Sequence, residues 1–184
     1  MPIIPISDQA LQDAAICLQD GGLVAFPTET VYGPGAIASD DKAVARIFAA
    51  KNRPQFNPLI SHFADSDNAL GAGRKTEVAH LLASHFWPGP LTLVLERHKD
   101  SPISLLASAG NDSVAVRVPD HKIARRLITL TGTPVVAPSA NPSGRISPSN
   151  AVHVKEGLGS LVATLNDNFP ISLNTRVLDI DYSG

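Results

Sequence analysis

Cysteine, charge and long apolar runs are all scarce in this sequence. Cys17 is the one cysteine among 184 residues, which excludes an intrachain disulfide and a multi-cysteine metal site and fits a reducing compartment. Charged residues make up 17%, and 15 Lys and Arg against 17 Asp and Glu leave a formal net charge of -2. Bulk charge therefore does not indicate binding to nucleic acid or to a membrane surface.

No feature of the sequence indicates a membrane protein. No stretch approaches the roughly 20 apolar residues that a membrane span requires. The N-terminal MPIIPISDQ lacks the basic segment and apolar run of a signal peptide. We therefore expect a cytoplasmic protein.

Common motifs of nucleotide and metal sites are missing or incomplete. The Walker pattern GxxxxGK[ST] is absent, which excludes a P-loop NTPase. Gly33, Gly35 and Ala38 satisfy a loose dinucleotide-binding pattern, but Pro34 interrupts it and no acidic residue follows about 20 positions later. The histidines form no HExxH pattern, so we expect no zinc site and assign no metal ligands.

Short apolar strands alternate with amphipathic helices along the chain. Strands are expected at residues 23–26, 59–63, 91–96, 113–119 and 134–137. Between them, helices are expected after caps at Ser7 and Ser39, at residues 78–86 and 121–131, with Gly132 beyond the end of the latter, and from Pro148 onward. This alternation predicts an α/β fold, a twisted mixed or parallel sheet with flanking helices, and the length fits one domain over residues 1–184.

The segment KNRPQFNPLISH combines two cations with a proline. Pro54 disfavours the helical conformation for Arg53, so the helix should break here and leave an extended chain. Lys51 and Arg53 would then project to one side, roughly 6 to 7 Å apart. The alternative is that both are ordinary cations at a helix C-terminus, where they complement the helix dipole.

The segment PSANP repeats this arrangement with uncharged polar groups. Pro138 and Pro142 bracket Ser139 and Asn141, which we expect to be extended and on one side. They follow the apolar residues 135–137, and ligands of open α/β sheets collect at the carboxyl ends of strands. The alternatives are an ordinary turn or a linker.

Two further polar features accompany predicted strands. In PTET, alternation would place Thr28 and Thr30 on one side and Glu29 on the other, although Ser and Thr at strand ends are often only turn formers. Arg117 lies in the apolar strand SVAVRVP and therefore needs a partner. It could pair with a structural carboxylate or bind the carboxylate of a substrate.

Five sequence blocks together resemble the YrdC family of threonylcarbamoyl-AMP synthases. They are FPTETVYGPG, KNRP with NPLISH, WPGPLTLVL, SVAVRVPDH and VVAPSANPSGRISPS, in family order over roughly residues 20 to 155. The resemblance implies a twisted α/β sheet around a concave, largely positive face. It also implies an ATP-dependent nucleotidyltransferase that joins L-threonine, bicarbonate and ATP, with Mg²⁺, into threonylcarbamoyl-AMP and pyrophosphate. The product would serve the threonylcarbamoyladenosine modification of tRNA, completed by partner proteins.

The resemblance also implies the site residues. The family's KxR and SxN elements correspond to Lys51 with Arg53 and Ser139 with Asn141, which would be catalytic. Threonine would contact Thr30, His62, Arg117 and Ser139. The nucleotide would contact Lys51, Arg53, Asn57, Ser113, Asn141 and Ser149. Lys51 and Arg53 would offset the negative charge of the phosphates, and Ser139 and Asn141 would supply oriented hydrogen bonds. The reaction would require no protein nucleophile.

The sequence departs from the family pattern near its C-terminus. Thr175 stands at the family's serine position, with Asn174 and Arg176 in place of the usual neighbours, and Pro34 replaces a leucine. The second domain of longer members is absent, so we expect a single-domain form or the catalytic part of a longer protein. Two alternatives stay open: an RNA-binding or ribosome-maturation module without catalysis, and a nucleotide-binding regulator with a broken site. Net charge does not indicate tRNA contact.

Overall fold

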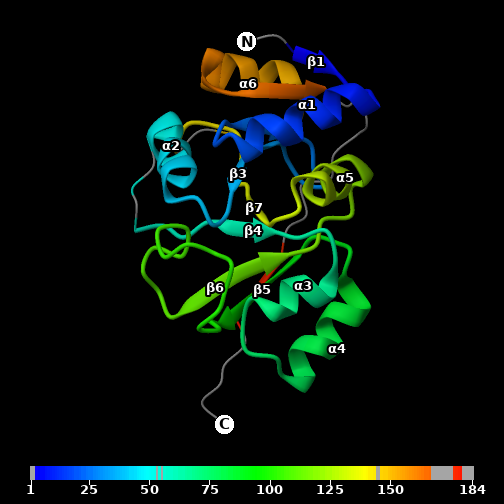
Figure 1. Cartoon of the computed structure of the whole chain (residues 1–184), viewed down its shortest axis with the longest axis vertical. Helices are drawn as coiled ribbons and strands as arrows, with labels where there is room; N and C mark the ends of the chain where they lie inside the picture. Colours follow the sequence, from blue (N-terminus) through cyan, green and yellow to red (C-terminus); the bar gives the residue numbers. More distant parts are fainter. Residues whose placement is uncertain (1–2, 53, 55, 144–145, 167–175, 180–184) are drawn as a thin grey trace.

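One mixed sheet runs through the molecule and carries helices on both faces (Figure 1). The computed structural model describes residues 3–52, 54, 56–143, 146–166 and 176–179. Within this part, the sheet order is β1-β8-β2-β3-β7-β4-β6-β5-β9. The strands are β1 Ile3–Pro5, β2 Val24–Phe26, β3 Gly33–Ile37, β4 Ile60–His62, β5 Leu91–Glu96, β6 Ser113–Arg117, β7 Val135–Val136, β8 Ala163–Asn166 and β9 Arg176–Asp179.

The strand pairing confirms the predicted α/β fold with a mixed sheet. β8 pairs in parallel with β1 and β2, β6 with β4, and β9 with β5. The pairs β2–β3, β3–β7, β4–β7 and β5–β6 are antiparallel. β2 and β3 are joined by a short connection, whereas β7 pairs with β3 and β4 although several helices and strands lie between them in the chain.

Strand β3 lies in the middle of the sheet although its sequence, GPGAI, suggests a turn. A side chain at Gly35 would place its Cβ 2.7 Å from Phe26 Cε1 and 2.9 Å from Val135 Cγ1. The glycine therefore permits close packing of three strands rather than a bend.

Six helices flank the sheet in the described part of the chain. They are α1 Asp8–Gln19, α2 Asp41–Lys51, α3 Ser66–Gly71, α4 Glu77–Phe86, α5 Lys122–Thr131 and α6 Ala151–Leu158, the last followed by the 3-10 turn Gly159–Leu161. Ser7 caps α1 as predicted. The predicted starts of two others are wrong: Asp40, not Ser39, caps α2, and α6 begins after an Asn150 cap rather than at Pro148. In both cases an Asx side chain that accepts backbone N–H bonds determines the start.

The helices divide the core between the two faces of the sheet. α1 and α5 pack on one face, against Phe26, Ile37 and Val135. α2, α3, α4 and α6 contribute to the cluster that contains alternate strand residues such as Ala36 and Val136. None of the described helices is both long and apolar enough to cross a membrane.

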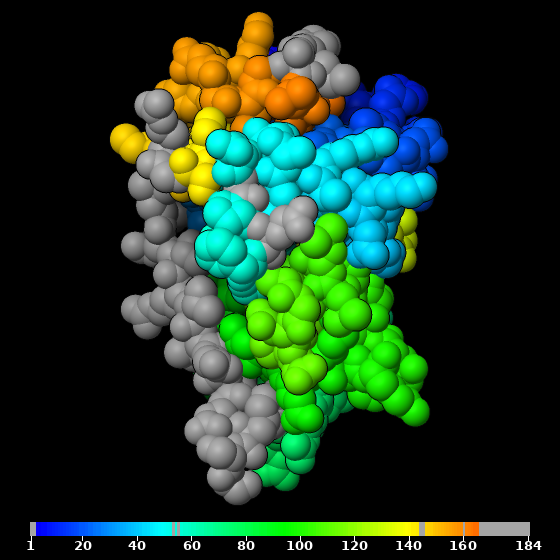
Figure 2. All heavy atoms as spheres, turned by 90° about the vertical axis from the view of Figure 1, so that its left-hand side faces the viewer, coloured from blue at the N-terminus to red at the C-terminus, as the bar shows by residue number. Residues whose placement is uncertain are grey.

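The connection between β5 and β6 packs against the two segments that flank α2. In Figure 2, which looks onto the left-hand side of the Figure 1 view, this green connection lies directly below the cyan α2 region. The contact is made by backbone hydrogen bonds, from Leu59 N to Ala107 O at 2.8 Å and from Ser104 N to Ala38 O at 2.8 Å. These bonds fix the approach to β4, the strand that carries His62.

Strand register places two polar residues beside the apolar face under α5. His62 of β4 is paired with Val135 of β7 on one side and with Arg117 of β6 on the other. Paired residues of neighbouring strands share a face, so the three form one row. Val135 is part of the core, whereas His62 and Arg117 are polar and each only 3% exposed. A buried polar row of this kind marks a candidate site.

Candidate functional site

A cavity of about 490 Å³ opens over this polar row. The segments after β2 and β7, strand β4 and the end of β6 meet there. Its wall is formed by Thr28, Thr30, Val31, Gly33, Ile60, His62, Arg117, Ala137, Pro138, Ser139, Ile146 and Ser147. All four residues predicted to contact threonine are among them: Thr30, His62, Arg117 and Ser139. We call this cavity the central cavity.

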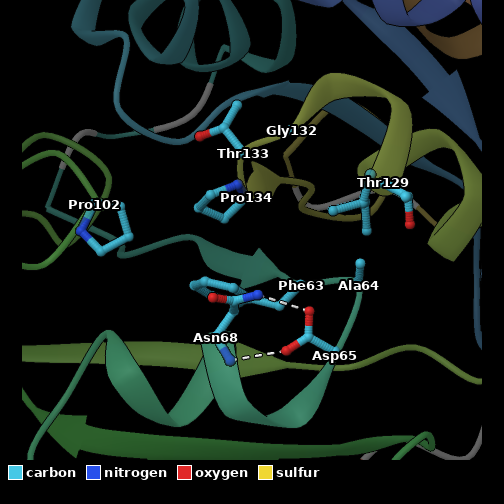
Figure 3. A pocket seen from close by; sticks show the side chains of 10 residues that line it. Phe63, Ala64, Asp65, Asn68, Pro102, Thr129, Gly132, Thr133 and Pro134 are labelled. Carbon is cyan, nitrogen blue, oxygen red and sulfur yellow. Dashed lines mark hydrogen bonds between the residues drawn. The ribbon is translucent and has the colours of Figure 1, made fainter.

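A second cavity, of about 420 Å³, lies between the start of α3 and the α5–β7 connection (Figure 3). The carboxylate of Asp65 in its wall accepts hydrogen bonds from Asn68 N at 2.9 Å and Asn68 Nδ2 at 2.7 Å, and so caps α3. Phe63, Pro102 and Pro134 provide apolar walls. None of the site residues predicted from the sequence lines this cavity, which leaves the central cavity as the candidate site.

Arg117 is held from three directions by other parts of the chain. Its Nε donates to Gly89 O at 3.1 Å, and its Nη2 donates to Glu29 Oε1 at 2.5 Å and Thr30 Oγ1 at 3.3 Å. The interpretation of Arg117 as the partner of a structural carboxylate is thereby confirmed, with Glu29 as the carboxylate. Nη1 has no hydrogen bond within the described residues, and Arg117 lines the central cavity.

A tight turn after β2 supplies the threonine wall of the cavity. Thr28 Oγ1 accepts from Thr30 N and Val31 N, each at 3.2 Å, and donates to Val31 O at 2.7 Å. The two threonine hydroxyls are 3.0 Å apart. Glu29 was predicted to face away from Thr28 and Thr30. This prediction is wrong for the carboxylate, which accepts a hydrogen bond from Arg117 Nη2, as the Thr30 hydroxyl does. The turn, not strand alternation, sets these directions.

His62 is a neutral imidazole in the floor of the central cavity. Burial, reinforced by the nearby positive charge of Arg117, lowers its pKa to about 3. Its Nδ1 is buried and has no hydrogen-bond partner in the described part of the chain. A neutral imidazole can donate with one nitrogen and accept with the other, which suits it to bind a hydroxyl group.

Lys51 reaches the PSANP segment with its side chain. Its Nζ donates to the main-chain oxygens of Ser139 and Asn141, and Ser143 N donates to Lys51 O at 3.0 Å. The side chain is buried, at 1% exposure. Lys51 is thus not a solvent-facing charge: it joins the end of α2 to residues 139–143.

Lys51 was predicted to be extended together with Arg53, and for Lys51 this prediction is wrong. Lys51 is the last helical residue, and Asn52 follows in the left-handed conformation with φ 49°. Pro54 constrains only the residue directly before it, so the helix continues to Lys51. Arg53 lies outside the described residues. The placement of Lys51 in the last turn of a helix agrees with the alternative interpretation, although its Nζ bonds to another loop.

The PSANP segment turns instead of running straight. Asn141 N donates to Ser139 O at 2.9 Å, which closes a turn over Ala140, so the predicted extended arrangement is wrong. Pro142 restricts only Asn141, and the lysine ammonium attracts both neighbouring carbonyls. Ala140 N also donates to Tyr32 O at 2.7 Å. These contacts exclude a linker.

Comparison with known proteins identifies the family. The family model Sua5/YciO/YrdC, described as telomere recombination, matches residues 17–182. The chain belongs to this family. The resemblance to YrdC proteins is therefore confirmed.

Several members of the Sua5/YciO/YrdC family named threonylcarbamoyl-AMP synthase are similar to this chain. The relative from Pyrococcus abyssi is 45% identical over 178 residues, covering 95% of this chain and 52% of its own length. The Bacillus subtilis relative is 44% identical over 171 residues, covering 92% and 49%. The Halorhodospira halophila relative is 36% identical over 157 residues, covering 84% and 81%. The chain spans about half the length of the first two relatives.

Solved structures of the family share this fold. P. abyssi Sua5 complexed with L-threonine has a TM-score of 0.92 at 42% identity, over 100% of this chain and 56% of that one. Escherichia coli YciO has a TM-score of 0.86 at 22% identity, over 99% and 91%, and supports the fold alone. That residues 1–184 form one domain stays a prediction.

The nucleotide residues implied by the Sua5/YciO/YrdC resemblance are not gathered in the central cavity. Asn57 is half-buried after α2, Ser113 begins β6, and Ser149 is exposed before α6. Asn141 is buried, and its Nδ2 donates to Pro142 O at 2.9 Å. Asn174 and Thr175 lie outside the described residues, and the backbone of Arg176 begins β9.

Sequence reasoning did not include Glu29 among the candidate site residues, although its carboxylate contacts Arg117. Glu29 stands beside Thr30 in the PTET block, and that adjacency was the available signal. In the part of the chain that the structure describes, no group of three or more His, Cys, Asp or Glu side chains could hold a metal ion.

Proposed function

We propose that this protein makes threonylcarbamoyl-AMP and pyrophosphate from L-threonine, bicarbonate and ATP. The observation that carries the proposal is the buried guanidinium of Arg117, which lies in one cavity with His62 and Thr30. A family structure 42% identical to this chain was solved with L-threonine. The relatives named as synthases favour this function over an RNA-binding module without catalysis.

The central cavity has the chemical groups that threonine requires. Arg117 Nη1 would bind the α-carboxylate through a charge-assisted hydrogen bond. Neutral His62 and the Thr30 hydroxyl would bind the hydroxyl of the substrate. Ile60 and Ala137 line the same cavity and would contact its methyl group.

The reaction needs positioning and charge stabilisation more than a protein nucleophile. The threonine amine bonds to the carbon of bicarbonate and water leaves. An oxygen of the resulting carbamate then bonds to the α-phosphorus of ATP while the bond from that phosphorus to pyrophosphate breaks. The enzyme must align these groups and offset the phosphate charge.

For the nucleotide we propose Arg53, Asn57, Ser113, Asn141 and Ser149 as contacts. Lys51 would support them by holding residues 139–143, with Ser139 directed at the cavity between the two substrates. Mg²⁺ would enter bound to the phosphates of ATP as part of the substrate. The product would pass to partner proteins that modify tRNA.

Pyrophosphate release tests the proposal. Purified protein given ATP, Mg²⁺ and bicarbonate should release pyrophosphate only when L-threonine is added, and mass spectrometry should detect threonylcarbamoyl-AMP. L-valine, which keeps the shape and lacks the hydroxyl, is the matched control substrate. Release that does not depend on threonine, or no release at all, would contradict the proposed function.

A further inference from the structure

Within the described part of the chain, the Glu29 carboxylate has one hydrogen-bond partner, Arg117 of the candidate site. The Glu29 carboxylate is not part of the cavity wall, and its side chain is 17% exposed. Oε1 accepts from Arg117 Nη2 at 2.5 Å, while Oε2 is buried and has no hydrogen-bond partner within the described part of the chain. Glu29 can therefore influence a ligand in the cavity by orienting the guanidinium.

The hydrogen bonds of Arg117 leave little freedom to the guanidinium plane. Gly89 O accepts from Nε, and both Glu29 Oε1 and Thr30 Oγ1 accept from Nη2. A planar group bound at Nε and Nη2 has its Nη1 direction fixed. Of the three acceptors, Glu29 alone carries a charge, so its hydrogen bond is also an ion pair with the guanidinium.

We propose that Glu29 is a positioning residue that fixes Arg117 so that Nη1 faces the carboxylate of the amino-acid substrate. This inference rests on the proposed function, which assigns that carboxylate to Arg117. Glu29 also supplies the negative charge that a buried arginine needs when the cavity holds no substrate. The geometry separates the two carboxylates, since Glu29 uses Nη2 and the substrate uses Nη1.

The opposite role of Glu29 is a competitor that occupies the guanidinium until substrate displaces it. The two roles predict opposite effects of Glu29→Gln on the affinity for threonine. If Glu29 positions Arg117, Glu29→Gln weakens threonine binding, because the bond to Nη2 loses its charge. If Glu29 competes, the same variant binds threonine more tightly.

The test measures threonine binding by calorimetry and, separately, KM for threonine and for ATP. Glu29→Gln should raise the threonine Kd about tenfold while the KM for ATP stays within about twofold. Glu96→Gln is the matched control, because Glu96 pairs with Arg74 at 3.0 Å on the surface, where side-chain exposures are 48% and 62%. It should change neither constant.

A double-variant cycle separates positioning from an independent effect. In an Arg117→Ala background, Glu29→Gln should produce no further loss of threonine affinity, because Glu29 acts only through Arg117. Additive losses, tighter binding by Glu29→Gln, or equal changes for threonine and ATP would each overturn the proposal. If Glu29→Gln does not fold, Glu29→Asp keeps the charge but shortens the reach, and unchanged threonine affinity in that variant would overturn it as well.

Binding and turnover distinguish this proposal from the function on which it rests. Wild-type protein that binds threonine but releases no pyrophosphate would contradict the synthase reaction, and the binding cycle would still decide the role of Glu29. Wild-type protein that does not bind threonine would overturn both.

Discussion

Lys51 donates a hydrogen bond from its ammonium group to the main-chain oxygen of Asn141, 90 residues further along the chain. A second bond reaches the oxygen of Ser139. The end of α2 and the loop after β7 are thus fixed to each other by a buried charge. Because Ser139 lines the central cavity, this contact controls the shape of the candidate site from outside it.

Removal of the Lys51 ammonium should lower the stability of the protein and also the rate of pyrophosphate release. Lys51→Met keeps the apolar stem but leaves two carbonyls without their charged donor, and we expect a loss of about 2 to 4 kcal/mol in the free energy of unfolding. Denaturant unfolding and pyrophosphate release would measure the two effects. Lys42→Met, at an exposed position in the first turn of the same helix, is the control. Unchanged stability with weaker ATP binding would instead mean that Lys51 contacts phosphate directly.

Sequence patterns predicted the architecture better than the ends of its elements. Alternating apolar strands and helices predicted the mixed α/β sheet, and the residues at 78–86 correspond closely to α4. Strand β3 was not predicted, because a glycine such as Gly35 is typical of a turn. In the fold this glycine instead allows neighbouring strands to pack closely. The cap of α2 was misplaced by one residue because Ser39 and Asp40 are both good capping residues.

The threonine part of the candidate site was predictable, but the directions of its side chains were not. Thr30, His62, Arg117 and Ser139 follow from the family blocks and meet in one cavity. Local rules failed for Glu29, because the Thr28 turn and not strand alternation sets its direction. Contacts between segments about 90 residues apart leave no periodic signal in a single sequence.

Loss of the Arg117 side chain should affect threonine far more than ATP. Arg117→Ala removes the guanidinium from the cavity wall, and we expect the threonine KM to rise roughly a hundredfold with a small change in the KM for ATP. Steady-state pyrophosphate release at varied threonine and then varied ATP measures both constants. Arg74→Ala, from an exposed ion pair, is the control. Equal increases in the two KM values would contradict the assignment of Arg117 to the carboxylate.

A methyl group at Gly35 should strain the centre of the sheet. The added Cβ would lie 2.7 Å from Phe26 Cε1 and 2.9 Å from Val135 Cγ1, closer than carbon atoms approach without displacement. Gly35→Ala should therefore lower the free energy of unfolding by about 1 to 3 kcal/mol. In Gly71→Ala, the control, the new Cβ meets no atom within 4 Å. Equal stability of the two variants in urea would show that β3 can shift to accommodate the methyl group.

Acid should destabilise the protein through His62. The folded-state pKa is lowered to about 3, first by burial and then by Arg117, against an ordinary value of 6.5. Between these two values the unfolded chain binds a proton at this residue and the folded protein does not, so the stability falls as the pH falls. From pH 7 to pH 5 this residue alone should remove about 2 kcal/mol from the free energy of unfolding.

Two variants separate the contribution of His62 to the pH dependence of stability from that of the other titrating groups. His62→Gln has no imidazole to protonate, so its free energy of unfolding should fall less between pH 7 and pH 5 than that of the wild type. His80→Gln, at an exposed position on α4, controls for the loss of a histidine elsewhere. Urea unfolding at both pH values gives the difference for each protein. If the wild type and His62→Gln lose the same stability, His62 is protonated in the folded protein at pH 5, and the neutral hydrogen-bonding role assigned to it in the central cavity does not hold there.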